Sequence, residues 1–429
     1  MRVLVKSFGC STNFADGAIL AGCLARAGYK LVGSVSSADV IVLNTCAVKG
    51  PTENRMIEIS KRIPLEKKLI VAGCLPLINF ERLQQEVSFS GAMGPAAGEG
   101  IVEVVNRVSK GEKVIALEET LNDLPKLNLP RLQSNPVTSI VPINYGCLGS
   151  CAYCCVVFAR GRLRSYDIQD IVGRVREDLA SGLREFWITS QDTACYGKDK
   201  GANLATLLHA LCRIDEDFRV RVGMMTPNNA LDILEELVQA FQDDRIFKFI
   251  HLPVQSGDDD VLKCMRRFYC VNDFKRVVEA FRARFPDITL ATDVICGFPG
   301  ETEEAFQRTL QLIEEVTPDI VNVSKFFARP KTAAAKMQKD SVPLSEIKRR
   351  STMASTLAKR LSLMNNQRWV GWSGGILVDE VGKVPGSWVG RNFSYKPVAV
   401  KCASKLIGKF VPAKIIRAFP TYLESSVIQ

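Results

Sequence analysis

Four cysteines lie within nine positions of the segment NYGCLGSCAYCCVVFARG, residues 144–161. Cys147, Cys151 and Cys154 follow the spacing C-x3-C-x2-C, directly after a predicted strand. Iron–sulfur clusters take thiolate ligands, and a four-iron cluster held by only three cysteines keeps one iron open to a small molecule. The spacing therefore predicts a cluster of this kind.

The alternative for this segment is a zinc site with Cys155 as the fourth ligand. Adjacent cysteines such as Cys154 and Cys155 point awkwardly for a closed tetrahedron, so the sequence favours the cluster. Cys155 is then expected to be a buried thiol that contributes to packing.

Three further cysteines each follow a strand-like run in the N-terminal part of the chain. The runs RVLVKSF, ADVIVLNTC and KLIVAGC alternate with amphipathic stretches at 14–27 and 52–62, which predicts βα units around an open parallel sheet. Ligands of such a sheet bind at the carboxyl ends of its strands. We therefore expect Cys10, Cys46 and Cys74 to converge there as metal ligands.

A second series of βα units begins near residue 138 and predicts a (β/α)6 partial barrel, with helices at 230–242 and 302–316 among its connections. The chemistry of such a barrel lies at the carboxyl ends of its strands. Gln191 and Asp192 end the second strand, and Gly297, Pro299 and Gly300 form a tight loop after the fifth. They are candidates for base and cofactor contacts, although a solvated strand end and a purely structural turn are the alternatives.

The predicted domains are residues 1–119, a proline-containing linker at 120–137, the core at 138–366 and a small antiparallel β-barrel at 367–429. The last range holds nine Lys or Arg against three Asp or Glu. Five of these cations have Trp388, Phe393 and Tyr395 nearby, so RNA binding is favoured over an ordinary solvated face. The five are Arg391, Lys396, Lys401, Lys405 and Lys409.

Composition narrows the class of protein. Fourteen cysteines and two histidines, without a signal-like N-terminus or an apolar run of membrane-spanning length, predict a cytoplasmic protein that uses thiols for metal or catalysis. The formal net charge of +10 fits an anionic partner.

A C-x3-C-x2-C motif after the first strand of a βα barrel resembles the radical S-adenosylmethionine superfamily. With FGCSTNFAD, NTCAV, VAGC, GFPGETEE, VNVSKFFARP and the ARG of residues 159–161, the whole chain resembles the methylthiotransferases of that superfamily. The resemblance implies an α/β N-terminal domain with an auxiliary cluster, a radical core and a C-terminal RNA-binding TRAM domain. It also implies two 4Fe-4S clusters, S-adenosylmethionine, a tRNA anticodon loop as substrate, and an electron donor such as ferredoxin or flavodoxin. We expect a monomer with no membrane partner.

The resemblance further implies which residues act. Met225 and Glu301 fall in segments that contact the cofactor, and Arg160 is expected to be catalytic. By their charge and their position near the core loop and the sixth strand end, Arg160, Arg329 and Lys325 are also candidates to receive a substrate carboxylate. The alternative is that they pair with acidic neighbours or with the cofactor carboxylate. The archaeal and eukaryotic branch, which methylthiolates N6-threonylcarbamoyladenosine beside the anticodon, is favoured. The alternatives are an isopentenyladenosine in tRNA, a ribosomal-protein aspartate, or a non-catalytic iron–sulfur RNA-binding protein.

Overall fold

The computed structural model describes residues 1–117 and 124–427 and divides into two compact units. The first unit comprises Met1–Ser134, Ile140–Arg174 and Phe327–Lys336, and the second comprises Asn135–Ser139, Val175–Phe326 and Met337–Gln429. The C-x3-C-x2-C segment thus belongs to the same unit as the N-terminal sheet. Residues 120–123 of the predicted linker lie outside the described residues, and the domain boundaries drawn from the sequence remain a prediction.

The first unit is built on a parallel sheet with the strand order β2-β1-β3-β4-β5-β6. After β1 the chain forms β2 at one edge of the sheet and then returns to form β3 on the other side of β1. The direction of strand addition therefore reverses here, and the β1/β3 boundary is a topological switch point. All six residues of β3 are buried, as expected for a strand covered on both faces. The strands are β1 (Arg2–Ser7), β2 (Lys30–Leu31), β3 (Val40–Thr45), β4 (Lys68–Gly73), β5 (Gly91–Met93) and β6 (Val114–Ala116).

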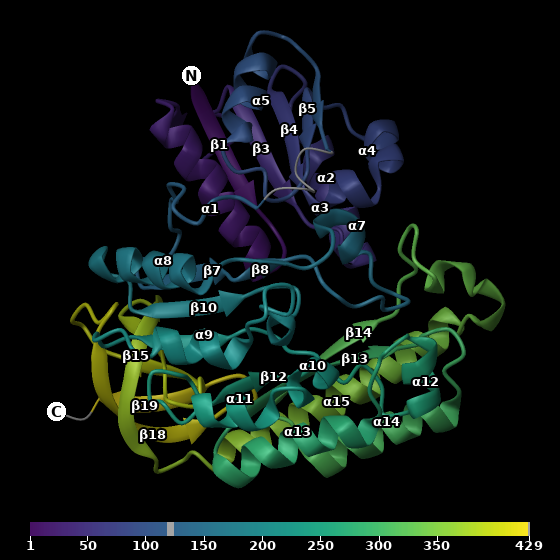
Figure 1. Ribbon diagram of the computed structural model, residues 1–429, viewed down its shortest axis with the longest axis vertical. Coiled ribbons are helices and arrows are strands. Elements are labelled where there is room, and N and C mark those ends of the chain that lie inside the picture. Colours follow the sequence, from purple (N-terminus) through teal and green to yellow (C-terminus); the bar gives the residue numbers. More distant parts are fainter. Residues whose placement is uncertain (118–123, 428–429) are drawn as a thin grey trace. The chain divides into compact units, whose positions relative to one another are not determined.

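Helices cover both faces of this sheet (Figure 1). One apolar core forms under α1 (Ser11–Arg26) and α5 (Gly100–Ser109). The other forms under α2 (Gly50–Lys61), α3 (Cys74–Ile78), α4 (Phe80–Glu86) and the short α7 (Val156–Arg160), which comes from the distant cysteine motif. Near that motif the short strands β8 (Asn144–Tyr145) and β9 (Arg164–Ser165) pair with each other.

The strands of the second unit follow one another in chain order across two three-stranded sheets, β7-β10-β11 and β12-β13-β14. A parallel bridge between Val220 and Ile246 joins β11 to the segment before β12, and the predicted (β/α)6 partial barrel is confirmed. The strand bounds are β7 (Thr138–Pro142), which begins in this unit, β10 (Glu185–Thr189), β11 (Arg219–Val222), β12 (Phe249–His251), β13 (Thr289–Cys296) and β14 (Ile320–Lys325).

The helices of this unit depart from the sequence prediction at one place. The single helix predicted at 230–242 is wrong, because the backbone of Ile233 leaves the helical region and separates two shorter helices. The helix predicted from Thr302 is confirmed, and the Thr302 hydroxyl accepts the Ala305 N–H at its start. The bounds are α8 (Ile168–Ala180), α9 (Leu204–Leu211), α10 (Pro227–Leu231), α11 (Leu234–Ala240), α12 (Asp259–Cys264), α13 (Val271–Arg284), α14 (Glu303–Val316) and α15 (Leu344–Gln367).

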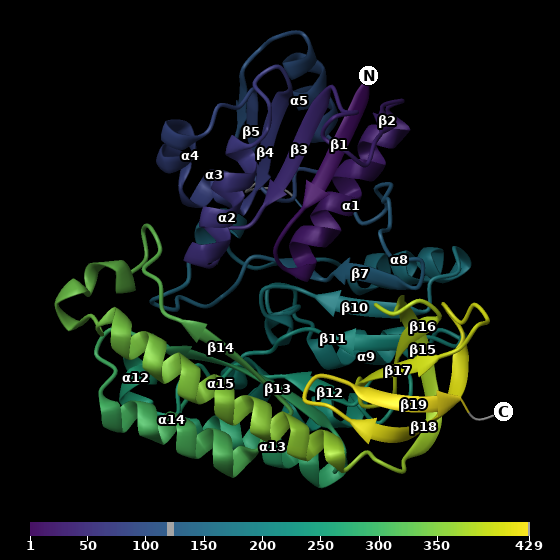
Figure 2. The same cartoon turned by 180° about the vertical axis from the view of Figure 1, so that it is seen from behind.

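The second unit ends in a closed barrel with the order β15-β16-β17-β19-β18 (Figure 2). The predicted barrel is confirmed, except that β17 and β19 pair in parallel. Tyr395 packs on Phe247 with ring centroids 4.8 Å apart, so the barrel shares its core with the partial barrel. No helix in residues 1–117 or 124–427 is long and apolar enough to span a bilayer. The strands are β15 (Ser373–Val381), β16 (Ser387–Arg391), β17 (Pro397–Lys401), β18 (Phe410–Ala418) and β19 (Leu423–Val427).

Candidate iron–sulfur and cofactor sites

Two of the core-loop cysteines Cys147, Cys151 and Cys154 flank one glycine. The Gly149 N–H points at the Cys147 sulfur over 3.2 Å, and a Cβ on Gly149 would lie 3.3 Å from that sulfur and 3.6 Å from the Cys151 sulfur. Burial raises the pKa of the Cys154 thiol, and the nearby Cys151 adds to the rise. The three sulfurs therefore share one small loop.

The N-terminal cysteines, Cys10, Cys46 and Cys74, also converge, as predicted. A Cβ on Gly9 would lie only 2.9 Å from the Cys46 sulfur, and one on Gly73 would lie 2.4 Å from the carbonyl oxygen that precedes Cys46. Both glycines have positive φ, and each directly precedes a cysteine.

Both cysteine sets fit iron–sulfur clusters by their donor chemistry. Burial raises the pKa of the Cys74 thiol to about 12 and also raises the pKa of the Cys46 thiol. The nearby Cys10 adds to the rise in both pKa values. A buried thiol gives up its proton when a metal ion takes the proton's place. Among the described residues, no three His, Cys, Asp or Glu are grouped tightly enough for a single metal ion. Cluster ligands bind different irons, so they need no such tight grouping.

Cys155 has the packing role predicted for it. Its side chain is 1% exposed, its sulfur faces the Ala47 carbonyl oxygen at 3.8 Å, and it belongs to the core beneath α3. Cys154 therefore stays with the core loop while its neighbour anchors α7 to the N-terminal sheet. Cys155 is therefore not available as the fourth ligand of a zinc site at Cys147, Cys151 and Cys154.

The two arginines proposed to receive a substrate carboxylate are buried in ion pairs within the first unit. Arg329 pairs with Glu53, which also accepts hydrogen bonds from Arg82 and Asn79 at 2.8 and 2.9 Å. Arg160 pairs with Asp16 at 2.7 Å. Lys325, the third candidate, is exposed on β14. Both guanidinium groups are buried and already paired with a carboxylate, which disfavours that role.

Asp192 acts as a structural hub at the end of β10. Its carboxylate accepts the N–H groups of Ala194 and Thr226 at 3.1 and 3.0 Å on one oxygen. The other oxygen accepts the Thr226 hydroxyl and the Asn229 amide. The side chain is 1% exposed. Asp192 therefore fixes the start of α10, and a direct catalytic role remains only a prediction.

Gln191 and Met225 directly precede two residues of this hydrogen-bond network, Asp192 and Thr226. Gln191 is half-buried directly before Asp192. Met225 is fully buried, and its N–H donates to the His251 carbonyl at 2.9 Å. The carboxyl ends of β10, β11 and β12 are thereby tied together, as the partial-barrel rule predicts.

The predicted cofactor loop after β13 is held by its own side chains. One oxygen of Glu301 accepts the Gly297 N–H and the Arg350 guanidinium, each at 2.8 Å. Burial raises the pKa of Glu301, and Arg350 opposes the rise. Glu301 therefore shapes the loop, whereas Pro299 is buried and Gly300 is exposed within it.

The loop gives a matched pair of stability predictions. Gly297 and Gly300 have similar φ values of +80° and +84°, but a Cβ on Gly297 would lie 2.3 Å from Ile347 and one on Gly300 would meet nothing within 4 Å. Gly300→Ala should cost only the backbone strain, about 1–2 kcal/mol, and Gly297→Ala roughly 1–3 kcal/mol more through overpacking. Urea unfolding measures both. Equal losses would contradict the packing of Ile347 on this loop.

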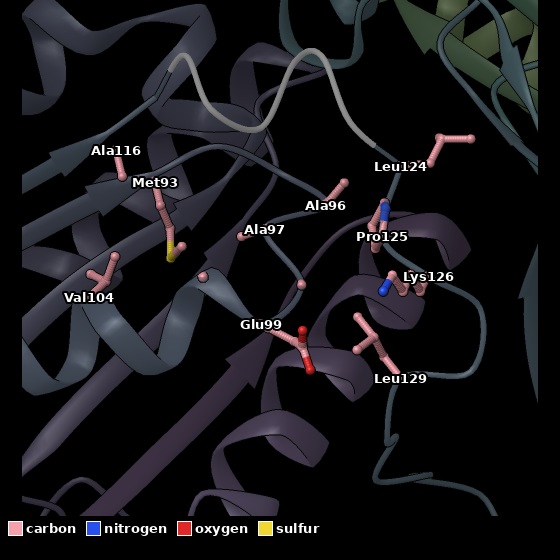
Figure 3. A pocket seen from close by; sticks show the side chains of 12 residues that line it. Met93, Ala96, Ala97, Glu99, Val104, Ala116, Leu124, Pro125, Lys126 and Leu129 are labelled. Carbon is pink, nitrogen blue, oxygen red and sulfur yellow. The ribbon is translucent and has the colours of Figure 1, made fainter.

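A separate cavity of about 350 Å³ opens beyond β5 and β6 in the first unit (Figure 3). Met93, Val104 and Leu129 supply apolar walls, and Glu99 and Lys126 are its charged lining residues. Glu99 is paired with Arg26. None of the cysteines lines this cavity, so the cavity plays no part in the site proposed below.

Comparison with known proteins identifies the domains of the chain. Residues 2–93 match the uncharacterized protein family UPF0004, residues 141–313 the Radical SAM superfamily and residues 375–428 the TRAM domain. The chain has the same fold as a solved radical S-adenosylmethionine methyltransferase of Kitasatospora setae that holds cobalamin and a 4Fe-4S cluster. The TM-score is 0.55 at 14% identity, over 90% of this chain and 79% of that one.

Proteins found by sequence are much more similar to the chain than this solved structure is. The chain is 41% identical to a probable threonylcarbamoyladenosine tRNA methylthiotransferase of Pyrococcus abyssi, over the full length of both chains. It is 37% identical to the human threonylcarbamoyladenosine tRNA methylthiotransferase, over all of this chain and 74% of the human one. Such identity over the whole length shows common descent, and the chain belongs to the family of threonylcarbamoyladenosine tRNA methylthiotransferases, which are radical S-adenosylmethionine enzymes with an iron–sulfur cluster.

Proposed function

We propose that the chain converts N6-threonylcarbamoyladenosine beside the anticodon of tRNA into its 2-methylthio form. The observation that carries the proposal is the presence of two separate three-cysteine sets in one compact unit. One set suffices to generate a radical, whereas inserting sulfur requires a sulfur source as well. The names of the relatives supply the substrate.

Each part of the chain then has a task. When bound, the two clusters and S-adenosylmethionine supply a radical that removes hydrogen from the base, and the sulfur and methyl group that replace it. Cys147, Cys151 and Cys154 would hold the radical-forming cluster, and the N-terminal cysteines the second one. The Gly297 loop and the hub at Asp192 shape the strand ends where the cofactor and base would bind. A ferredoxin-like or flavodoxin-like electron donor, a monomeric state and a cytoplasmic location remain predictions.

The RNA-binding surface of the barrel differs from the predicted one. Lys396 is buried and bonds Asp319 at 2.6 Å and Asn366 at 2.9 Å. Arg391 pairs with Asp379 and Glu380. These two cations support the fold, because their charges are used internally. Exposed cations that can meet a phosphate backbone include Lys383, Lys401, Lys405, Lys409, Lys414 and Arg417, of which Lys401 lies 4.0 Å from Glu424.

Changing three of these exposed cations should weaken tRNA binding. With Lys401, Lys405 and Lys409 all replaced by Gln, the slope of log affinity against log salt should fall by about 2–3, since each lost phosphate contact removes about 0.7–0.9. Filter binding at several salt concentrations measures the slope.

The control for this variant removes the same charge elsewhere in the second unit. Lys263, Lys348 and Lys359 are exposed lysines on α12 and α15, and replacing all three by Gln should leave the slope unchanged. Equal slopes for the wild type and the barrel variant would exclude the barrel as the tRNA anchor.

The substrate is tested with tRNAs that differ in one modification. The cluster-loaded enzyme should form methylthio product, detected by nucleoside mass spectrometry, from tRNA carrying threonylcarbamoyladenosine and not from tRNA carrying isopentenyladenosine. An anticodon-loop adenosine is unpaired and can enter a pocket without the cost of breaking a base pair. Turnover of only the isopentenyl form or of a ribosomal protein would reject the substrate but not the chemistry. A lack of 5′-deoxyadenosine with every substrate would favour the non-catalytic alternative.

A further inference from the structure

Two buried carboxyl groups meet at the barrel interface, where the closed barrel packs on the partial barrel (Figure 2). Glu185 begins β10 of the partial barrel and Asp379 lies on β15 of the closed barrel, and the two residues are 0% and 1% exposed. Their side chains lie within hydrogen-bonding reach of each other. A carboxylate can only accept a hydrogen bond, so a bond between two carboxyl groups requires a proton on one of them.

The donors around the pair reach only one oxygen of each carboxyl. Glu185 Oε1 accepts the Trp187 indole N–H and the Tyr395 hydroxyl. Asp379 Oδ2 accepts the Arg391 guanidinium at 3.0 Å. The other two oxygens, Glu185 Oε2 and Asp379 Oδ1, are buried and meet no N–H or hydroxyl donor in the part of the chain that the structure describes. These two oxygens are therefore left for the contact between the carboxyl groups.

The closed barrel provides one cation for this group of acids. Arg391 of β16 pairs with Asp379 at 3.0 Å and also with the exposed Glu380. Its single positive charge is therefore already shared by two carboxylates of β15. A further negative charge on Glu185 would be buried without a cation of its own, which is costly in a protein interior.

The cations of the neighbouring strand β11 have other contacts. Arg219 lies beside Glu185 in the strand register, but its guanidinium pairs with Asp217 at 2.7 Å. Arg221 lies over the ring of Tyr395, with its Cζ 5.3 Å from the ring centroid. Among the described residues neither arginine forms an ion pair with Glu185. A proton, rather than a cation, is thus the group that can neutralise Glu185.

Burial of the two carboxyls acts in the same direction. It raises the pKa of Glu185 from 4.5 to about 8, and the charge of Asp379 adds to the rise. Burial also raises the pKa of Asp379, and Arg391 opposes that rise. At neutral pH the pair therefore holds one proton and carries one negative charge, which lies beside Arg391.

We propose that Glu185 and Asp379 share one proton that stabilises the docking of the closed barrel on the partial barrel. The closed barrel is the part of the chain that matches the TRAM domain, so the proton makes the attachment of this domain sensitive to pH. Docking raises the pKa of Glu185, so it is most stable below the ordinary value of 4.5 and weakens as the pH rises toward about 8. The shared proton is independent of the proposed substrate, because both carboxyls lie within the second unit.

A backbone hydrogen bond across the same interface reports its opening. The Lys248 N–H of the partial barrel donates to the Phe393 carbonyl of the closed barrel at 2.7 Å. Hydrogen exchange of the Lys248 amide, divided by its rate in an unstructured peptide at the same pH, gives the opening constant of the interface. In the wild type this constant should rise roughly fiftyfold from pH 6 to pH 8, as expected for the loss of one proton.

Two variants remove the shared proton, and a third serves as the control. Glu185→Gln should abolish most of the rise, because an amide donates a hydrogen bond at every pH. Asp379→Asn should also reduce the rise and acts on the other side of the interface. Glu380→Gln is the matched control, since Glu380 bonds the same arginine but is exposed, and it should keep the pH dependence of the wild type.

Infrared spectroscopy detects the proton directly. The carbonyl band of a protonated carboxyl group lies apart from that of a carboxylate, and the wild type should lose one such group between pH 6 and pH 9. The same band should be missing at pH 7 in Glu185→Gln. The titration of the wild type requires no variant, so it decides the proposal even where a variant does not fold.

Three results would overturn the shared proton. The first is an opening constant of the wild type that does not change between pH 6 and pH 8. The second is an equal rise in Glu185→Gln and the wild type, which would assign the pH dependence to another group. The third is an infrared spectrum of the wild type without a protonated carboxyl that titrates between pH 6 and pH 9.

Discussion

Replacing any one of Cys147, Cys151 and Cys154 by Ala is expected to abolish the cleavage of S-adenosylmethionine. Three thiolates hold three of the four irons and leave one open, so the loss of one thiolate leaves the cluster with only two protein ligands and should prevent its stable binding. Formation of 5′-deoxyadenosine, measured by liquid chromatography after anaerobic reconstitution, should fall to the level seen without protein.

The neighbouring cysteine provides the control for this experiment. Cys155→Ala should keep both the iron and the cleavage activity, since its sulfur lies in the core against Ala47. Removing one buried sulfur should lower the free energy of unfolding by about 1–2 kcal/mol. If Cys155→Ala loses the cluster while a variant of Cys147, Cys151 or Cys154 retains it, the ligand assignment is wrong.

The second large effect is expected when Cys10, Cys46 and Cys74 are all replaced by Ala. Methylthio product should disappear while 5′-deoxyadenosine still forms, because the radical source and the sulfur source use different cysteines. Iron content should drop to roughly half, as expected for loss of one of two similar clusters.

Cys23 allows a matched control in the same unit. It is buried on α1 in the core on one face of the sheet, and Cys23→Ala should leave iron content and product unchanged. Unchanged iron in the triple variant would refute a cluster at the N-terminal set, and product formation without that set would refute its role as the sulfur source.

The sequence by itself predicted most of the elements and which cysteines lie together. Hydrophobic periodicity is local, so it reports strands and helices wherever packing agrees with propensity. It failed at 230–242, where Ile233 interrupts the predicted helix. The strand-end cysteines could be placed together because the carboxyl ends of parallel strands meet at one edge of a sheet. The closed barrel followed from short runs punctuated by glycine and aromatic residues.

Only the tertiary structure decided which charged residues are free. Arg329 and Glu53 are 276 positions apart in the chain, Arg160 and Asp16 are 144 apart, and Lys396 and Asp319 are 77 apart. No local pattern encodes such pairs, because a side chain's partner is set by the folding of distant segments.

Only the tertiary structure likewise decided which part of the protein the core-loop segment packs against. The sequence places Cys155 and Arg160 with the radical motif. In the structure, Cys155 lies in a core of the N-terminal sheet, and Arg160 bonds Asn13 and Asp16 of α1. Packing of α7 on α3 produces this arrangement, and that packing depends on apolar surfaces more than 70 residues apart in the chain. The sequence thus predicted the sulfur ligands, while the fold decided which residues pair with the arginine that follows them.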